Sequence, residues 1–248
     1  MVDQSLSDAA LAADIARQAG DLLLALQRSG AASGKELGDR GDRDANALIL
    51  DRLRAARPDD AILSEESADD LSRCQCRRAW IVDPLDGTRE YAEGRDDWAV
   101  HIGLSIDGAP AVGAVALPGA GLVLGTDPAP VLGAGQVPPR ILVSRTRPPG
   151  ECRAVAKALG AELVPMGSAG AKAMAVVRGL GDIYLHSGGQ YQWDNCAPVA
   201  VALAAGLHAS RLDGSPIVYN RRERAIPDLL ICRREWAEPV LALVRDCG

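Results

Sequence analysis

An apolar segment that runs into two acids and then a glycine–threonine pair, within residues 80–91, is the feature that most constrains this fold. The segment begins with β-branched and aromatic residues, which favour a buried strand. Pro84 has no N–H to donate and stops the ladder, so Asp83 and Asp86 fall at the carboxyl end of the strand. The segment therefore predicts a buried strand that delivers two carboxylates to one edge of a sheet.

The two acids are suited to a cation, and the residues after them are suited to a phosphate. On a tight turn, the carboxylates of Asp83 and Asp86 and the carbonyl of Leu85 can point at one cation, an all-oxygen set that suits Mg²⁺. Gly87 allows a ligand close to the backbone, and the N–H groups of Gly87 and Thr88 would open a helix whose dipole favours an anion. Alternatively, the segment forms only a turn, because Asp, Pro and Gly are turn residues for independent reasons.

The composition is that of an ordinary globular protein with an acidic balance. The 248 residues suffice for one domain or two closely packed halves. Because the chain has no Phe, its core must be built from Ala, Val, Leu and Ile. The net charge of −6 and the scattered basic residues argue against a nucleic-acid polymer as partner. An acidic protein that binds an anionic phosphate needs a cation between the two, which agrees with a carboxylate–metal site.

The cysteines and the N-terminal segment indicate a reducing compartment away from membranes. Cys74 and Cys76 lack the second pair that a zinc site requires, so we expect the six cysteines to be free thiols. The N-terminal segment has no basic and apolar signal region, and no apolar run approaches the length of a membrane span. We therefore expect a cytoplasmic protein with no membrane partner.

Two helices are predicted before the first strand. Residues 7–28 carry an apolar stripe at helical spacing, with Ser7 as the N-cap. Residues 33–44 are rich in glycine and charge and predict a loop, which leads into a second helix at residues 45–56. Asp44 then falls at the N-cap of the second helix, where capping alone would explain its carboxylate.

Another short strand also ends in acids. Residues 61–64 are followed by Glu65 and Glu66. Ligand sites of α/β sheets collect where strands end, so Glu65 meets Asp83 and Asp86 if the two strands are neighbours. Taken alone, the glutamate pair is typical of a solvated turn.

The middle of the chain predicts antiparallel strands. Residues 99–105 and 111–117 alternate as strands do, the dipeptide Asp107-Gly108 between them is a hairpin signal, and a further strand is expected at residues 121–125.

A proline-rich stretch separates two predicted halves, residues 1–127 and residues 139–248. Strand and helix signals alternate in the second half, which predicts an α/β pattern. They fall at residues 141–144, 151–159, 163–164, 169–178 and 183–185. 

A very apolar helix is predicted at residues 195–205, directly after Asp194. A lone Asp at a helix start is most simply a cap. The helix is nearly free of polar residues and should be buried, so it could also hold Asp194 rigidly in a cleft.

Four separated features occur in an order that is typical of one family. They are an acid-bearing helix start at Asp44, Glu65-Glu66 after a strand, Asp83-Pro84-Leu85-Asp86-Gly87-Thr88, and Trp193-Asp194 before an apolar helix. Together they resemble the inositol monophosphatase-like family of Mg²⁺-dependent, lithium-sensitive phosphatases. The resemblance implies an α/β protein with α-β-α-β-α layers, a mixed or antiparallel sheet in the first half, and a metal site between the halves.

The resemblance also implies roles for individual residues. The metal ligands would be Glu65, Asp83, Asp86, Asp194 and the Leu85 carbonyl, which would hold two or three Mg²⁺ ions; Li⁺ would inhibit. Asp44 and Thr88, with Glu65, would orient and activate the attacking water. The N–H groups of Gly87 and Thr88 would hold the phosphate, with Asp86 and Asp194 beside it.

Two points depart from the family pattern or lie outside it. The family usually has a Thr-x-x-Asp stretch before the second helix, whereas this chain has Gly41-Asp42-Arg43-Asp44, so Asp42 competes with Asp44 for the water-orienting role. The histidines are expected to be structural or peripheral, because all three fall outside the metal motif: His101, His186 and His208.

The substrate is inferred from finer resemblances. Residues 86–91 resemble the 3′(2′),5′-bisphosphate nucleotidases of the family, whereas inositol phosphatases usually continue Asp-Gly-Thr-Thr-Asn-Phe. Lys172, with Ser168 nearby, would contact the second phosphate, although a lysine on a helix usually lies at the surface.

The implied reaction removes the 3′-phosphate of 3′-phosphoadenosine 5′-phosphate (PAP) to give AMP, as part of sulfate assimilation. The sulfated form, 3′-phosphoadenosine 5′-phosphosulfate, is a further expected substrate. One alternative is an inositol phosphatase or another sugar-phosphate phosphatase, for example for fructose 1,6-bisphosphate. A second is a non-catalytic metal- or phosphate-binding protein. The resemblance also allows a homodimer.

Overall fold

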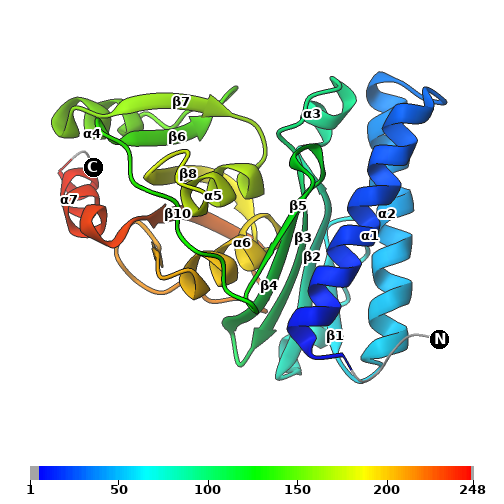
Figure 1. Cartoon of the computed structure of the whole chain (residues 1–248). Helices are drawn as coiled ribbons and strands as arrows, with labels where there is room; N and C mark the ends of the chain where they lie inside the picture. Colours follow the sequence, from blue (N-terminus) through cyan, green and yellow to red (C-terminus); the bar gives the residue numbers. More distant parts are fainter. Residues whose placement is uncertain (1–5, 247–248) are drawn as a thin grey trace.

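Five alternating layers make up the molecule (Figure 1). The computed structural model describes residues 6–246, and within them two five-stranded sheets alternate with three layers of helices. The expected α/β class and α-β-α-β-α arrangement are confirmed. Among the described residues, no helix combines the length and the apolar character needed to cross a membrane.

The first sheet is mixed, with one parallel pair and otherwise antiparallel neighbours. In spatial order its strands are β1 (Ala61–Ser64), β2 (Arg78–Asp86), β3 (Ala99–Ile106), β4 (Ala109–Leu117) and β5 (Leu122–Gly125). β1 runs parallel to β2, and Ser64 pairs with Val82. Glu65 and Asp83 therefore emerge at the same edge of the sheet. The hairpin predicted between β3 and β4 is confirmed.

Two long helices, α1 (Asp8–Ser29) and α2 (Gly34–Ala56), cover the outer face of this sheet (Figure 1). The predicted N-cap of α1 is confirmed, because the Ser7 hydroxyl accepts a hydrogen bond from the N–H of Ala10 at 3.2 Å. The cap satisfies one of the N–H groups that a helix start leaves without a partner.

The loop predicted at residues 33–44 was wrong, because α2 already begins at Gly34. Gly38 and Gly41 lie inside the helix, at places where another side chain would not fit. A Cβ on Gly38 would lie 2.8 Å from Cγ2 of Thr88, and a Cβ on Gly41 would lie 3.0 Å from two neighbouring side chains. The glycines thus permit α2 to pack closely against the segment after β2, and they do not end the helix.

The second sheet is also mixed, and its strands lie in the order β7-β6-β8-β10-β9. They are β6 (Arg140–Ser144), β7 (Glu162–Met166), β8 (Ile183–Tyr191), β9 (His208–Ser210) and β10 (Ala225–Cys232). β6 is parallel to β7 and β8, whereas β10 is antiparallel to β8 and β9. The last two strands, and the helix after them, were not assigned from the sequence.

The remaining helices complete the layers. They are α3 (Thr88–Ala92), α4 (Glu151–Leu159), α5 (Ala169–Val177), α6 (Gln192–Ala204), α7 (Arg234–Arg245) and the 3₁₀ turns η1 (Ser72–Gln75) and η2 (Pro118–Ala120). α5 and α6 lie between the sheets, and α4 and α7 cover the far face of the second sheet (Figure 1). The largest apolar core is centred on α5 and α6, where it contacts both sheets.

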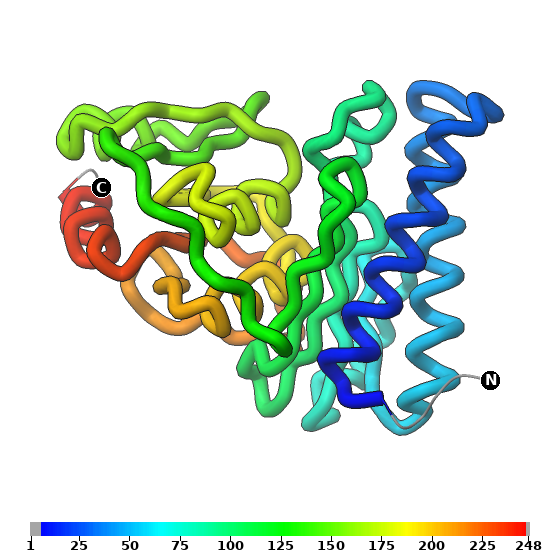
Figure 2. The backbone as a smooth tube through the Cα atoms, in the orientation of Figure 1, coloured from blue at the N-terminus to red at the C-terminus, as the bar shows by residue number. Residues whose placement is uncertain are grey.

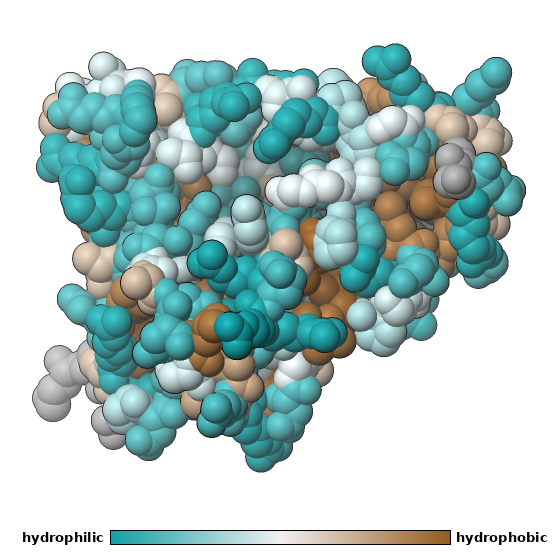
Figure 3. Space-filling model, turned by 180° about the vertical axis from the view of Figure 1, so that it is seen from behind, coloured by the Kyte–Doolittle hydropathy of each residue, from teal (hydrophilic) through white to brown (hydrophobic). Residues whose placement is uncertain are grey.

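The chain passes from the first sheet to the second through residues 126–139, the green segment of Figure 2. From the opposite side, hydrophilic residues cover most of the surface, and apolar residues gather toward the C-terminal half (Figure 3).

The described cysteines are free thiols: Cys74, Cys76, Cys152, Cys196 and Cys232. Cys247 lies outside the described residues.

Candidate active site

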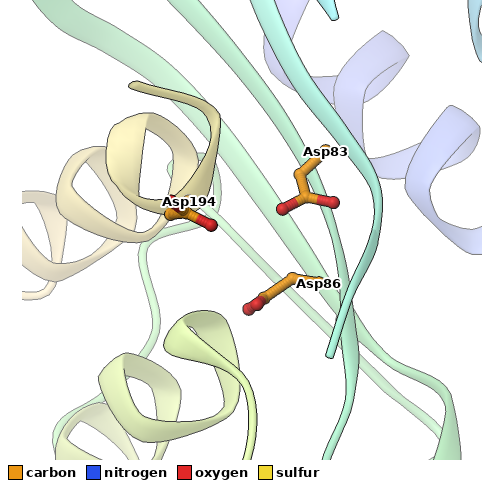
Figure 4. Close-up of side chains that lie close together, drawn as sticks. All are labelled: Asp83, Asp86 and Asp194. Carbon is orange, nitrogen blue, oxygen red and sulfur yellow. The ribbon is translucent and has the colours of Figure 1, made fainter. Parts of the chain in front are cut away.

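Three carboxylates converge between the two sheets (Figure 4). Asp83 and Asp86 come from β2 and Asp194 from α6, and one oxygen of each lies within 4.8 Å of the others. The β2–β3 ladder is interrupted between Asp83 and Asp86 and resumes at Asp86, so β2 does not end at Pro84 as predicted. This irregularity lets two acids of one strand face the same space. Carboxylate oxygens at such separations can hold a metal ion.

Asp194 has two roles at the start of α6. It is the third residue of the helix, not the residue before it, and its carboxylate accepts a hydrogen bond from the N–H of Tyr191 at 2.5 Å. The interpretation as a cap is therefore correct in substance. The same bond holds the carboxylate at the acid cluster, so capping and a place in the cluster do not compete.

Glu65 joins the cluster from β1. Its N–H donates to the carbonyl of Val82 at 3.3 Å, which continues the parallel pairing one residue beyond the strand. Although much of the residue is exposed at the edge of the site, its carboxyl group lies beside that of Asp83.

Burial and mutual repulsion raise the pKa values of these acids. Burial is the largest cause for each. For Glu65, repulsion from Asp42 and Asp86 adds to the effect of burial, and the pKa rises to about 7. For Asp194, repulsion from Asp86 adds to the effect of burial, and the pKa also rises to about 7. The pKa of Asp83 is raised well above its usual range by burial and by the neighbouring carboxylates. A bound cation would reverse this repulsion, which is the physical reason that the cluster fits a metal.

Asp86 has the opposite surroundings. Burial opposes its charge, but His101, Ser168 and the N–H of Gly170 outweigh burial and lower its pKa to about 2. The Oδ2 atom accepts from the Ser168 hydroxyl at 2.5 Å and from the Gly170 N–H at 2.6 Å, and Nε2 of His101 lies 3.2 Å away. With Oδ2 so engaged, Oδ1 remains for a cation.

His101 was missed as a site residue. It is fully buried on β3, directly opposite Asp83 in the ladder, and its Nδ1 lies 3.0 Å from the carbonyl of Trp193. Gly170 has to be a glycine, because a Cβ there would lie 2.0 Å from Nε2 of His101. The available signal was a polar residue in a buried strand next to the acid-bearing strand, which becomes informative only when the register is known.

Thr88 and Asp42 form a pair beside the cluster. The Thr88 hydroxyl donates to the carbonyl of Leu85 at 3.1 Å and lies within hydrogen-bond reach of the Asp42 carboxylate. Burial, with repulsion from Glu66, raises the pKa of Asp42 to about 7. Gly87 precedes Thr88 with a φ of 92°, a conformation that favours glycine.

Asp44 lies elsewhere, which corrects the prediction that placed it at a helix start facing the site. It is in the middle of α2, and its carboxylate lies 3.4 Å from Arg40 and 3.6 Å from Arg43. Since successive residues of a helix turn by about 100°, positions 42 and 44 point to different sides of α2. The competitor Asp42 is the acid that reaches Thr88.

A cleft of about 310 Å³ leads from the acid cluster, and Ser168 and Lys172 lie along it. Lys172 is only 5% exposed, so the alternative of a surface lysine was wrong. Its ammonium donates to the carbonyls of Gly167 and, at 2.6 Å, Ser168, and burial lowers its pKa to about 8. Lys172 therefore fastens the segment whose hydroxyl and N–H groups hold Asp86.

The chain is similar to proteins of known function and fold. A family model described as the inositol monophosphatase family matches residues 4–248. A Mycobacterium leprae protein named 3′-phosphoadenosine 5′-phosphate phosphatase is 52% identical, over 97% of this chain and 94% of its own length. The Escherichia coli 3′(2′),5′-bisphosphate nucleotidase CysQ is 31% identical, over 73% of this chain and 79% of its own length.

Solved structures agree on the fold. The crystal structure of CysQ from Bacteroides thetaiotaomicron matches with a TM-score of 0.78 at 24% identity, covering 92% of this chain and 97% of that one. An inositol monophosphatase from Anabaena matches with a TM-score of 0.73 at 24% identity, covering 95% and 94%. At these identities the likeness shows the fold alone.

Proposed function

The chain belongs to the inositol monophosphatase family, and from this we propose that it is a Mg²⁺-dependent phosphatase that removes the 3′-phosphate of PAP to give AMP. The observation that carries the proposal is the convergence of Asp83, Asp86 and Asp194 at the end of a cleft lined with cationic side chains. The similarity to the M. leprae relative, named for activity on PAP, supports this substrate. The sulfated form of PAP is proposed as a second substrate.

Metal binding is proposed for the acid cluster. Glu65, Asp83, Asp86, Asp194 and the Leu85 carbonyl would hold two or three Mg²⁺ ions, and Li⁺ would inhibit. Ions in this place would neutralise charge on the phosphoryl oxygens, make a water molecule easier to deprotonate and stabilise the leaving oxygen. The raised pKa values of three of these acids support the proposal, because they reflect repulsion that a cation relieves.

Water activation is proposed for Thr88 and Asp42, with Glu65 on the other side of the water. The Thr88 hydroxyl, which donates to the Leu85 carbonyl in the structure, would turn to donate to Asp42 and accept a hydrogen bond from the water. The water would then lose a proton to Thr88 as Thr88 passes its own proton to Asp42. A general base works best when its pKa is near the working pH, and the pKa of Asp42 is about 7. The N–H groups of Gly87 and Thr88 would hold the phosphate.

Ser168 and Lys172 are proposed to act through Asp86. Both lie along the cleft, but the Ser168 hydroxyl is bonded to Asp86 and the Lys172 ammonium to two carbonyls. We assign them the positioning of Asp86, where the sequence suggested direct contact with the second phosphate.

The test is phosphate release with Mg²⁺ from PAP and from inositol 1-phosphate, compared as kcat/KM. The proposal predicts a strong preference for PAP. A ratio near one or below would transfer the assignment to an inositol or sugar phosphatase. No release from any ester, by wild type or by Asp83→Asn, would indicate a non-catalytic binding protein.

A further inference from the structure

We propose that Arg147, together with His186 in the same cleft, forms the subsite for the second phosphate of the substrate, the one that is not cleaved. This inference rests on the proposed function and identifies the residues that would distinguish a bisphosphate from a monophosphate. It follows from an inventory of the positive charges along the cleft. Four cationic side chains and a histidine line it: Arg89, Arg145, Arg147, Lys172 and His186.

Two of the five are already engaged with protein groups. Arg145 lies 2.9 Å from a carboxylate oxygen of Glu90 and 2.8 Å from one of Glu93, so its charge is matched by two acids. Lys172 is largely buried in the cleft wall, and its ammonium donates to the carbonyls of Gly167 and Ser168. Binding a phosphate to either would first require breaking these contacts.

Arg147 is free to bind an anion. Among residues 6–246, no acidic side chain forms an ion pair with its guanidinium, and the residue is exposed at the rim of the cleft. The backbone N–H of Arg147 donates to the Ser144 hydroxyl at 3.2 Å, and this hydrogen bond fixes the backbone of the loop that carries Arg147. A guanidinium presents a planar set of donors that suits two phosphate oxygens at once.

His186 supplies a second unused group in the same cleft. Its Nε2 lies 2.9 Å from the carbonyl of Gly188, whereas Nδ1 is buried and has no hydrogen-bond partner among the described residues. Burial first, and then the positive charges of Lys172 and Arg147, lower the pKa of His186, and all three residues line the same cleft. A phosphate placed there would offset the charges that keep the ring neutral, and Nδ1 would then take up a proton and donate to it.

Arg89 is the cleft's other arginine without an acidic partner within the described range. It directly follows Thr88 on α3 and so belongs to the first half of the molecule, at the end where the cleaved phosphate is proposed to bind. Arg147 and His186 come from the second half, on the loop after β6 and on β8. Arg89 is therefore the matched control for Arg147.

The experiment compares kcat/KM for PAP and for adenosine 3′-monophosphate, which lacks the second phosphate, at saturating Mg²⁺. Arg147→Gln is expected to lower the value for PAP by about tenfold to a hundredfold, the worth of a charged hydrogen-bonded contact. For the monophosphate it is expected to change less than about threefold, since the group that Arg147 contacts is missing. His186→Asn should shift the ratio in the same direction by a smaller factor, and Arg89→Gln should leave the ratio nearly unchanged.

Thermal melting of each variant shows whether it folds as the wild type does. Equal losses on both substrates in Arg147→Gln, or a selective loss of PAP activity only in Arg89→Gln, would overturn the subsite. A wild-type enzyme that prefers inositol 1-phosphate to PAP would instead overturn the proposed function, so the two failures are distinguishable.

Discussion

Asp83 and Asp86 lie three residues apart on β2, yet their surroundings move their pKa values in opposite directions. Asp83 belongs to a crowded group with Glu65 and Asp194, in which burial and repulsion favour the protonated form. Asp86 is supported by a histidine, a hydroxyl and a backbone N–H, which favour its charged form. The group around Asp83 thus lacks a compensating positive charge, whereas the protein itself stabilises the charge of Asp86.

The difference indicates how the fold divides the work of binding a cation. His101 of β3, with Ser168 and Gly170 at the start of α5, holds one carboxylate charged and oriented before any ion arrives. The crowded acids contribute negative charge that only a cation can stabilise. Such a site would bind divalent ions strongly without being fully preformed.

Removing an acid of the crowded group should have the largest effect. Asp83→Asn is expected to lower kcat for PAP by roughly 10³-fold or more, because several kcal/mol of charge stabilisation are lost with the metal. Phosphate release in steady state measures it. Activity within about tenfold of wild type would show that the cluster is not the catalytic centre.

Substitution of Asp42 and of Asp44 tests which of the two acids activates the attacking water. Asp42→Asn is expected to lower kcat by roughly 10²-fold or more, the usual contribution of a general base. Asp44→Asn should remain within about twofold, because its carboxylate pairs with Arg40 and Arg43 of its own helix. The reverse pattern would restore the assignment suggested by the family motif.

Lys172→Met tests the supported side. Without the ammonium, the segment that holds Asp86 loses its anchor, and Mg²⁺ affinity measured by calorimetry is expected to weaken by about tenfold to a hundredfold. The preference for PAP over adenosine 3′-monophosphate should stay constant. Lys157→Met, at an exposed position of α4, is the control. Unchanged Mg²⁺ affinity with a selective loss of PAP activity would instead make Lys172 a phosphate ligand.

The smallest effect is on stability and depends on pH. In the metal-free protein, the crowded acids bind protons up to about pH 7 when folded, but only up to about pH 4 when unfolded. Their contribution to stability is therefore present below pH 4 and is lost as pH rises through 7. Asp86 has the opposite sign, since its contribution is present above pH 4 and is lost as pH falls toward 2.

The Tm of metal-free Asp83→Asn relative to wild type is the corresponding measurement. Between pH 5 and pH 8, we expect the Tm of the variant to rise relative to the Tm of the wild type by roughly 2–4 °C, the shift that about 1 kcal/mol gives in a chain of this size. Saturating Mg²⁺ should stabilise the wild type more at pH 8 than at pH 5. A constant difference across this range would contradict the crowding.

Local sequence signals predicted the parts of the site that lie on single segments. Residues 80–91 alone predict the strand, its two acids, the turn at Gly87 and the start of α3. Ser7 predicts the start of α1, because its hydroxyl can cap a helix. The meeting of Glu65 with Asp83 required only that two strands be neighbours, which the structure confirms.

The errors arise where tertiary contacts decide. Gly38 and Gly41 indicated a loop, but they lie inside α2, where they permit close packing against neighbouring segments. This error moved the predicted helix start next to Asp44. His101 reaches Asp86 only through the register of β3, and Lys172 is buried by groups distant in the sequence. Neither contact has a local signature.

The most direct measurement of the central claim is phosphate release from PAP by the wild-type protein, first in excess chelator and then as Mg²⁺ is titrated in, with the Tm followed in parallel at pH 8. The account predicts no release above background in chelator, activity that rises with Mg²⁺ to a plateau, and a Tm that rises over the same concentrations. Release in chelator as fast as at saturating Mg²⁺, with an unchanged Tm, would contradict it.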